Sequence, residues 1–128
     1  MIGCDANGTN CVLQITVTNS SKAVQSTNVL PFVPPKAMRL PVAVVTATVG
    51  ASVSVVVDGE TEEAEITLTT SATAMFVMLT TKESGRFSDN AFLLEAGAVR
   101  KVSFVAWGVL DIAALKASLR VEHLQQNL

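Results

Sequence analysis

The sequence predicts an all-β protein built as an antiparallel sandwich. Three observations support this class: apolar and polar residues alternate in several short segments, turn-forming residues separate these segments, and Val and Thr are abundant. About seven or eight short strands and one short helix fit the pattern, which is typical of immunoglobulin-like domains. The Cys-Trp-Cys arrangement and the tyrosine corner of antibody domains are absent, since both Cys precede the first strand and the chain has no Tyr. We therefore expect an immunoglobulin-like sandwich without antibody-type chemistry.

Composition excludes several classes of function. The 128 residues make one domain, large enough to bury roughly two-thirds of the surface of the unfolded chain. Apolar residues make up 49 % and charged residues 16 %, which indicates a folded chain. The net charge is -2 and the nine Lys and Arg are scattered, so we expect no nucleic-acid partner. The uncharged run 41–57 is interrupted by Gly50 and by Ser and Thr, and predicts two strands rather than a membrane-spanning helix.

In this interpretation residues 1–11 form a disordered or loosely held N-terminal segment, and residues 12–128 form the domain. An acidic and polar run follows the first residue too soon for a signal peptide, so the chain begins like an excised fragment as much as like a natural start. Cys4 and Cys11 fit a small disulfide loop in an oxidising compartment, and they fit two ordinary thiols equally well.

The predicted sandwich begins with a half-buried strand at residues 12–18. Its alternating apolar side chains are Leu13, Ile15 and Val17. A turn at residues 19–22 leads to an apolar run at residues 27–33. We interpret this run as an edge segment, because Pro31 and the Pro-Pro pair that follows remove ladder donors. Residues 42–49 are expected to form the next strand.

The clearest hairpin joins residues 52–57 to residues 62–70. Both segments alternate, and the Asp58-Gly59 pair between them is a strong hairpin turn, since both residue types tolerate positive φ. Gly50, just before the first segment, marks a tight turn or a bulge. The inward side chains of the second segment are Ala64, Ile66 and Leu68.

An apolar strand at residues 74–79 is expected inside a sheet, with both faces covered at least in part. The polar segment 80–84 lets the chain turn. A brief strand at residues 92–94, a turn at 95–98 and a longer strand at 99–107 follow. The side chains on one face of the longer strand are Val102, Phe104 and Ala106.

One helix is predicted near the C-terminus. Asp111 is its N-cap, and the helix covers residues 112–117. Residues 119–124 then alternate as a closing strand, with Leu119 and Val121 inward. The last four residues are polar and expected to fray.

The side chains give no catalytic or metal-binding constellation. Glycoside hydrolysis needs two carboxylates at a defined separation, whereas the acidic residues here gather in residues 58–65 and alternate outward around a hairpin turn. We interpret them as a solvated turn, with too few oxygen ligands for calcium. His123 has no Cys at a standard metal spacing and no nucleophile elbow to serve, and is expected to be structural or on the surface. We therefore predict no catalytic residue, no metal and no cofactor.

A carbohydrate-binding module is the second hypothesis for such a sandwich. Trp107 lies at a strand end, where an exposed ring can stack on a sugar, and four of the five Phe have core-like neighbours. A single Trp makes a small platform for a sugar ring. A free-standing adhesion or interaction domain is the third hypothesis.

Residues 85–94 read G-R-F-S-D-N-A-F-L-L. They resemble the G-R-F-S-D-N-x-F-L segment in the C-terminal domain of animal lysosomal-type β-mannosidases, which belong to glycoside hydrolase family 2. The resemblance extends back through the A-M-F-V-M-L strand at residues 74–79 and forward to the final strand, and so covers about the last 80 residues. Met78 stands where that family has Trp, and Ala106 where it has Pro.

The resemblance implies an immunoglobulin-like accessory domain at the C-terminal end of a multidomain β-mannosidase. The two catalytic glutamates of that family lie on an upstream (β/α)8 barrel, so none is carried over and this chain itself is not expected to be an enzyme. The parent would hydrolyse terminal β-mannose residues in a lysosomal or secreted setting, where sequons at Asn7 and Asn19 would accept N-glycans. The expected partners are the other domains of the parent chain, with β-mannoside glycans as a second candidate and no nucleic acid or membrane.

The segment that carries the resemblance also supplies the candidate site residues. Its Ser, Asp and Asn side chains are suited to bonding backbone groups in an irregular stretch, so we expect a structural loop. Arg86 and Trp107 are the candidates for contact with another domain or with a sugar. The loop residues are Ser88, Asp89 and Asn90, with Phe87 and Phe92 anchoring the two ends in the core.

Overall fold

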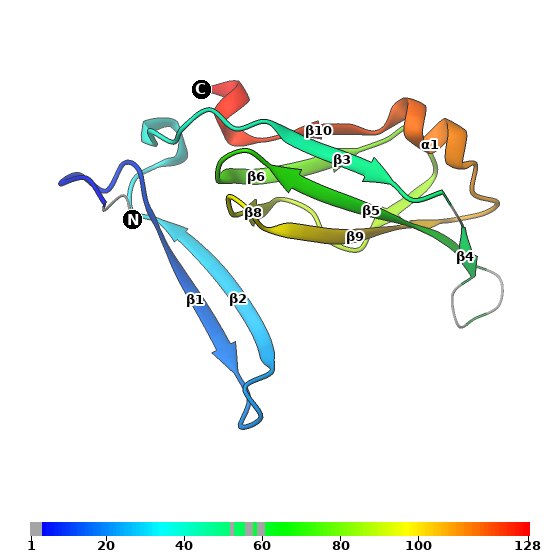
Figure 1. The fold of residues 1–128 in the computed structure, drawn as a ribbon, viewed down its shortest axis with the longest axis horizontal. Coiled ribbons are helices and arrows are strands. Elements are labelled where there is room, and N and C mark those ends of the chain that lie inside the picture. Colours follow the sequence, from blue (N-terminus) through cyan, green and yellow to red (C-terminus); the bar gives the residue numbers. More distant parts are fainter. Residues whose placement is uncertain (1–3, 52, 56–57, 59–60) are drawn as a thin grey trace. The chain divides into compact units, whose positions relative to one another are not determined.

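The computed structural model describes residues 4–51, 53–55, 58 and 61–128. It divides the chain into two compact units, Met1–Leu40 and Pro41–Leu128. The first unit contains a two-stranded hairpin and the second contains the remaining strands (Figure 1). The domain expected from the sequence, residues 12–128, spans both units.

Strands are the most abundant regular elements of the described residues, which also contain one α-helix and two short 3-10 helices (Figure 1). All strand pairs among the described residues are antiparallel, which confirms the predicted class. No helix in this part of the chain is both long and apolar enough to cross a membrane. The elements are β1 Val12–Thr18, β2 Val24–Pro31, η1 Pro35–Ala37, β3 Val45–Val49, β4 Ser54–Val55, β5 Glu62–Thr70, β6 Ala74–Thr80, β7 Gly85–Phe87, β8 Phe92–Leu94, β9 Val99–Ala106, α1 Ile112–Ser118, β10 Arg120–Glu122 and η2 Leu124–Asn127.

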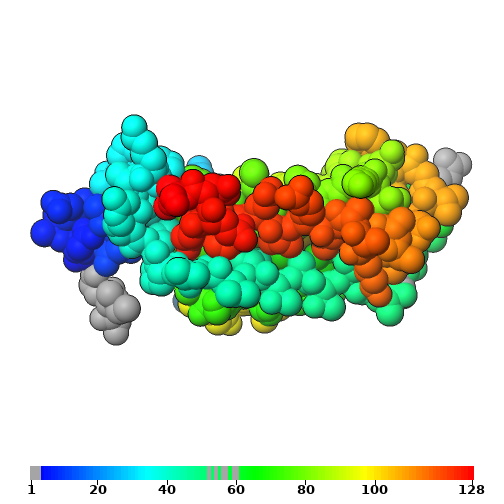
Figure 2. Space-filling view, turned by 90° about the horizontal axis from the view of Figure 1, so that it is seen from above, coloured from blue at the N-terminus to red at the C-terminus, as the bar shows by residue number. Residues whose placement is uncertain are grey.

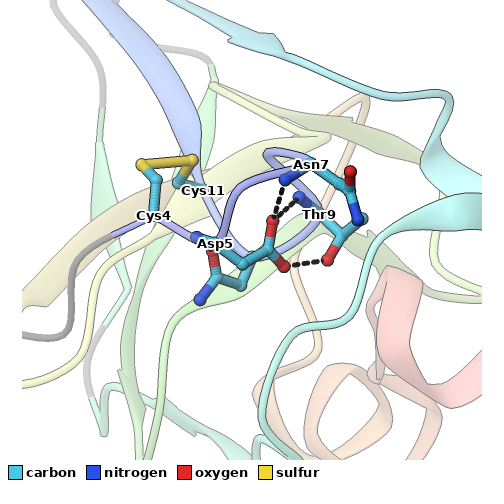
Figure 3. The surroundings of a disulfide bond; sticks show 6 residues. Cys4, Asp5, Asn7, Thr9 and Cys11 are labelled. Atoms are coloured by element: carbon cyan, nitrogen blue, oxygen red, sulfur yellow. Dashed lines mark hydrogen bonds between the residues drawn. A yellow bond between two sulfur atoms is a disulfide. The ribbon is translucent and has the colours of Figure 1, made fainter.

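A disulfide between Cys4 and Cys11 closes the loop that precedes β1 (Figure 3). Of the two alternatives for these cysteines, the structure has the bonded one. Inside the loop, the Asp5 carboxylate accepts hydrogen bonds from the backbone N–H of Asn7 at 3.0 Å and of Thr9 at 2.8 Å, and from the Thr9 hydroxyl. The described part of the N-terminal segment is therefore tied together by a covalent bond and by a carboxylate-centred network.

The β1–β2 hairpin turns through a polar segment built around Asn19. The Asn19 side-chain oxygen accepts from the backbone N–H of Ser21 at 3.0 Å and of Ala23 at 2.9 Å. Lys22 takes a positive φ of 61° in this turn. The second strand starts at Val24, earlier than the apolar run at residues 27–33 predicts, because pairing with β1 extends to the turn.

The second unit is a sandwich of two sheets (Figure 1). One sheet has the strand order β3-β5-β9-β7, with β4 also pairing β5, and the other has the order β10-β6-β8. The core between them takes its buried side chains from both sheets. These residues include Val49, Ala64, Ile66, Leu68, Val77, Leu79, Phe92, Leu94, Val102 and Phe104. This arrangement confirms the immunoglobulin-like sandwich.

The described residues of the predicted hairpin pair as β4 and β5. The pairing runs from Ser54 opposite Glu63 to Val55 opposite Glu62. Three residues of the predicted first strand, Ser52, Val56 and Val57, and Gly59 of the predicted turn lie outside the described residues. Along β5, the three predicted inward side chains are fully buried, as the alternation indicates.

Strand β6 is covered only in part on its second face. A positive φ of 53° at Phe76 accompanies a register shift between Ala74 and Val77, so the simple alternation breaks there. Met75 is buried, whereas Met78 is 44 % exposed. The strand therefore lies inside its sheet between β10 and β8, but its outer face is open near Met78.

The C-terminal segment packs as a helix, a short strand and a final turn of 3-10 helix. Asp111 caps α1 by accepting from the backbone N–H of Ala114 at 3.0 Å, as predicted. The expectation of frayed last residues is wrong, because the Gln125 amide accepts from Met75 N at 3.2 Å and donates to Thr73 O at 2.7 Å. Figure 2 shows this segment, orange to red, running alongside β3, where it closes one side of the sandwich.

Candidate interaction surface

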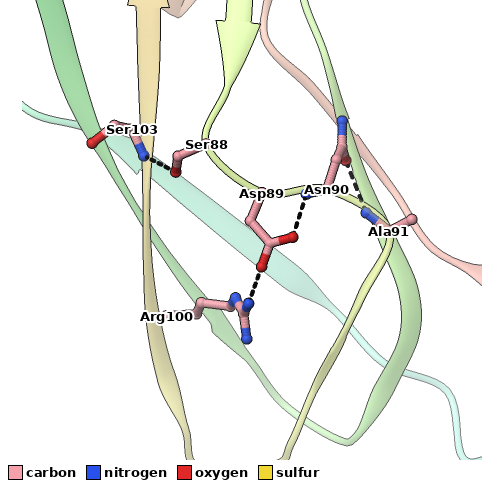
Figure 4. Close-up of polar contacts among 6 residues, drawn as sticks. All are labelled: Ser88, Asp89, Asn90, Ala91, Arg100 and Ser103. Carbon is pink, nitrogen blue, oxygen red and sulfur yellow. Dashed lines mark hydrogen bonds and ion pairs between the residues drawn. The ribbon is translucent and has the colours of Figure 1, made fainter. Parts of the chain in front are cut away.

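The G-R-F-S-D-N-A-F segment is the place where the chain crosses from one sheet to the other. Strand β7 pairs with β9 in the larger sheet, and β8 pairs with β6 in the smaller one. Residues 88–91 make the crossing (Figure 4). At its start, Ser88 holds the chain to β9 twice, since its N–H donates to Ser103 O at 2.8 Å and its hydroxyl oxygen accepts from Ser103 N at 3.0 Å.

Asn90 completes the crossing by acting as a strand partner for β6. Its side-chain oxygen accepts from Leu79 N at 2.8 Å, and its side-chain nitrogen donates to Leu79 O at 2.9 Å. The same oxygen accepts from the N–H of Ala91, which has a positive φ of 58°. The amide therefore satisfies two backbone groups of β6 beyond the last β6–β8 pair, Val77 opposite Phe92.

Asp89 lies at the surface of the crossing. Its carboxylate accepts from Asn90 N at 2.8 Å and forms an ion pair with Arg100 (Figure 4). The Arg100 guanidinium lies over the Phe92 ring, 4.2 Å from the ring centroid, in a cation–π geometry. The polar side chains of the crossing are thus engaged within the domain, which favours a structural role over ligand contact.

The two aromatic residues that flank the crossing pack in different sheets. Phe87, in β7, stacks at a tilt on Phe104 with ring centroids 5.2 Å apart. Gly85, at the start of β7, allows this close approach, because a Cβ there would lie 2.4 Å from Val105 O and 2.5 Å from the Phe104 ring. The sequence alone does not indicate this steric role of Gly85. Only the pairing of β7 with β9 makes it visible.

Arg86 and Trp107 lie on the outer face of the larger sheet. Arg86 pairs with Val105, and Trp107 lies two residues after Val105 in the chain. The side chains of these three residues therefore lie on one face of the sheet, and the Phe104 side chain lies on the other face. Trp107 is 73 % exposed. The three residues line a hollow of about 480 Å³ together with Thr61, Ala106 and Gly108. The structure therefore brings together the two residues predicted to contact a domain or a sugar.

The loop that carries Trp107 is fixed at both ends. Trp107 N donates to Ser84 O at 3.0 Å, and Leu110 N donates to the Glu62 carboxylate at 2.6 Å. Between these anchors Val109 is 92 % exposed. We call Arg86, Trp107 and Val109 the Trp107 surface. Sequence reasoning missed Val109 and the anchoring role of Glu62, although an isolated Val in a Gly-containing loop is a signal for an exposed apolar side chain.

Glu65 and His123 have partners within the domain. Glu65 forms a 2.9 Å ion pair with Lys101 across β5 and β9 at the surface. His123 is 3 % exposed, and its Nδ1 lies 3.1 Å from the Gln125 side-chain oxygen, which indicates a structural histidine. Within the described ranges, no group of three or more His, Cys, Asp or Glu side chains is placed to hold a metal ion.

These features define the class of protein as an immunoglobulin-like module. Residues 46–127 match the family model of the Ig-fold domain found in β-mannosidase-type enzymes. The chain therefore belongs to this family, and the resemblance seen in the crossing segment is confirmed. As an Ig-like accessory domain it is non-catalytic in itself. The match excludes β1 and β2. No curated protein matches the chain.

Proposed function

We propose that this domain is an accessory module of a β-mannosidase-type hydrolase, and that it packs on other domains of that enzyme through the Trp107 surface. The observation that carries the proposal is the large exposed ring of Trp107 on a loop fixed at both ends. Trp and Arg are the residues most enriched at the energetic centres of interfaces. A fixed loop also loses little conformational entropy when it docks.

The proposed parent enzyme has a separate catalytic domain, which hydrolyses terminal β-mannose residues. It works in a lysosomal or secreted setting, which the Cys4–Cys11 disulfide supports because disulfides persist in oxidising compartments. The exposed sequon residues Asn7 and Asn19 are compatible with the same route. The accessory domain contributes no catalytic carboxylate in this scheme.

A carbohydrate-binding role for the same surface is the second candidate. The hollow beside Trp107 is large enough for one or two sugar rings, and it offers the Arg86 guanidinium as a hydrogen-bond donor next to an aromatic face. One aromatic platform without a second stacking ring is a weak sugar site, and this favours the packing role.

An NMR titration of the 128-residue chain with mannose, mannobiose and chitobiose separates the two roles. The packing role predicts no saturable chemical-shift change around Trp107 when sugar is added. A Trp107→Ala variant is expected to show no saturable change either. Saturable shifts that cluster at Arg86, Thr61 and Trp107 and vanish in Trp107→Ala would replace the packing role by sugar binding. The reading frame upstream of Met1 tests whether the parent is a β-mannosidase-type hydrolase, because the proposal requires a catalytic barrel in the same chain.

A further inference from the structure

Strand β3 ends the larger sheet, and within the described residues it pairs with β5 alone. At one end of this pairing Gly50 N donates to Glu65 O at 2.8 Å. At the other end Ser71 N donates to Val44 O at 3.1 Å. The even-numbered residues therefore direct their backbone groups at β5, and the odd-numbered ones direct theirs away from it. These outward-directed residues are Val45, Ala47 and Val49, and in the described part of the chain no hydrogen bond outside the β3–β5 ladder involves them.

The sequence of β3 lacks the features that prevent pairing with another strand. Its five residues, V-T-A-T-V, include no charged residue, Pro or Gly. Exposed sheet edges are normally very short, or carry charged residues or Pro that block a further strand. The other strands at the ends of the two sheets, β7, β8 and β10, have three residues each, and β7 and β10 contain charged side chains. Among these four strands β3 is therefore the best suited to a further strand.

A hollow beside this edge can receive a side chain from a further strand. It has a volume of about 400 Å³ and lies between β3 and the segment that runs from α1 to β10. Figure 2 shows these two segments next to each other at the surface. An apolar side chain on the inner face of an added strand would be shielded from water here. The lining residues are Ala47, Thr48, Val49, Lys116, Leu119 and Val121.

The sequence of β3 is complementary to itself when a second copy runs antiparallel to it. With Ala47 of both copies at a two-fold axis, Val45 of one copy lies opposite Val49 of the other. The outward-directed backbone groups of the two strands then meet and form ladder hydrogen bonds. The Val–Val pairs lie on the inner face and bury apolar surface. Thr46 lies opposite Thr48 on the outer face, and Thr–Thr pairs are favourable across strands.

We propose that β3 is an interface between two copies of this chain, which join edge to edge around a two-fold axis at Ala47. The larger sheets of the two copies then form one continuous sheet. A pair of five-residue strands is smaller than a standard interface, which buries roughly 800 Å² on each partner, so the dimer is weak and forms at sub-millimolar concentration. The inference does not depend on the proposed parent enzyme, because the Trp107 surface involves β7 and β9, at the other end of the sheet.

A disulfide test measures the contact at the axis. In Ala47→Cys the two Cα atoms of a hydrogen-bonded pair lie about 5.5 Å apart, which is within the range of a disulfide. We expect mild oxidation of the concentrated 128-residue variant to give a covalent dimer on a non-reducing gel. Thr69→Cys, at an exposed position of β5, is the matched control and should remain monomeric. No covalent dimer in Ala47→Cys, or equal amounts in both variants, would overturn the proposal.

Charged side chains on the outer face test the register without a disulfide. Thr46→Lys/Thr48→Lys places like charges opposite each other across the axis, and we expect sedimentation to show at least about tenfold weaker association. Thr46→Lys/Thr48→Glu places opposite charges there and should restore association. The control Thr67→Lys/Thr69→Lys carries its charges on β5, beside the same two positions, and should associate like the wild type. Thermal melts show that each variant is folded. A folded wild type that stays monomeric at sub-millimolar concentration, or equal association of all variants, would contradict the dimer.

Hydrogen exchange shows whether a different segment covers the edge. The amides of Val45, Ala47 and Val49 should exchange faster when the chain is diluted, because the dimer dissociates. Protection of these amides at every concentration in a monomeric chain would overturn the inference, since the edge would then be covered within one chain.

Discussion

The side-chain amide of Asn90 binds both backbone groups of Leu79, accepting from its N–H at 2.8 Å and donating to its carbonyl at 2.9 Å. One side chain thus extends the pairing of β6 at the point where the chain leaves one sheet for the other. The most distinctive segment of the sequence is, in this respect, a connector between the two sheets.

Asn90→Ala is expected to lower the free energy of unfolding by about 1–3 kcal/mol, because it leaves two part-buried backbone groups without partners. Urea denaturation followed by circular dichroism measures the loss. Thr80→Ala is the control, at an exposed position of the same strand, and should change stability by less than about 0.5 kcal/mol. Equal stability of Asn90→Ala and the wild type would show that the amide does not hold the crossing.

Asp89→Ala should lower the free energy of unfolding by about 1 kcal/mol or less, which is a smaller loss than for Asn90→Ala. The reason is that the Asp89–Arg100 ion pair lies at the surface and is screened by solvent. The cost should shrink further in 1 M salt. The same denaturation series at low and high salt measures it. A loss as large as that of Asn90→Ala, insensitive to salt, would mean that the carboxylate satisfies buried groups.

Gly85→Ala is expected to destabilise the domain by about 1–3 kcal/mol, since the added methyl group would press on Val105 O and the Phe104 ring. Gly108→Ala is the matched control, because a Cβ there meets nothing within 4 Å. Thermal melts of the two variants give the comparison. If both variants melt like the wild type, β7 does not pack on β9 as closely as described.

The pKa of Asp5 is lowered below its ordinary value of 3.8, first by the Thr9 hydroxyl and then by backbone N–H groups of the loop. A lowered folded pKa stabilises the loop above the unfolded pKa, and this contribution is lost as pH falls through the folded pKa. An NMR titration of the Asp5 carboxyl from pH 6 to 2 measures the shift. Thr9→Val should raise the Asp5 pKa towards its ordinary value. A wild-type Asp5 that titrates at or above that value would contradict the network.

Much of the sandwich could be predicted because apolar and polar residues alternate along its strands. The pattern of β5 identifies Ala64, Ile66 and Leu68 as inward, and all three are fully buried. Asp111 caps its helix through a bond within one turn. Alternation also identifies β1 as a strand, but it does not indicate that β1 and β2 lie in a compact unit of their own.

The remaining features depend on contacts between distant residues. Gln125 fixes the C-terminus through Met75, 50 positions away, so a polar tail looks frayed when it is considered alone. The residue types of the crossing indicate backbone hydrogen bonds, but Ser103 and Leu79 become their partners only once the sheets are paired. Arg86 and Trp107 meet for the same reason, through the register of β7 with β9.

The accessibility of Trp107 in the parent enzyme shows whether the domain packs through the Trp107 surface. Hydroxyl-radical footprinting with peptide-level mass spectrometry compares the 128-residue chain with the intact parent enzyme. Packing through the Trp107 surface predicts strong oxidation of Trp107 in the chain and at least about tenfold weaker oxidation in the parent, with or without mannose. Equal oxidation of Trp107 in both would contradict the account, as would protection of the chain by mannose alone.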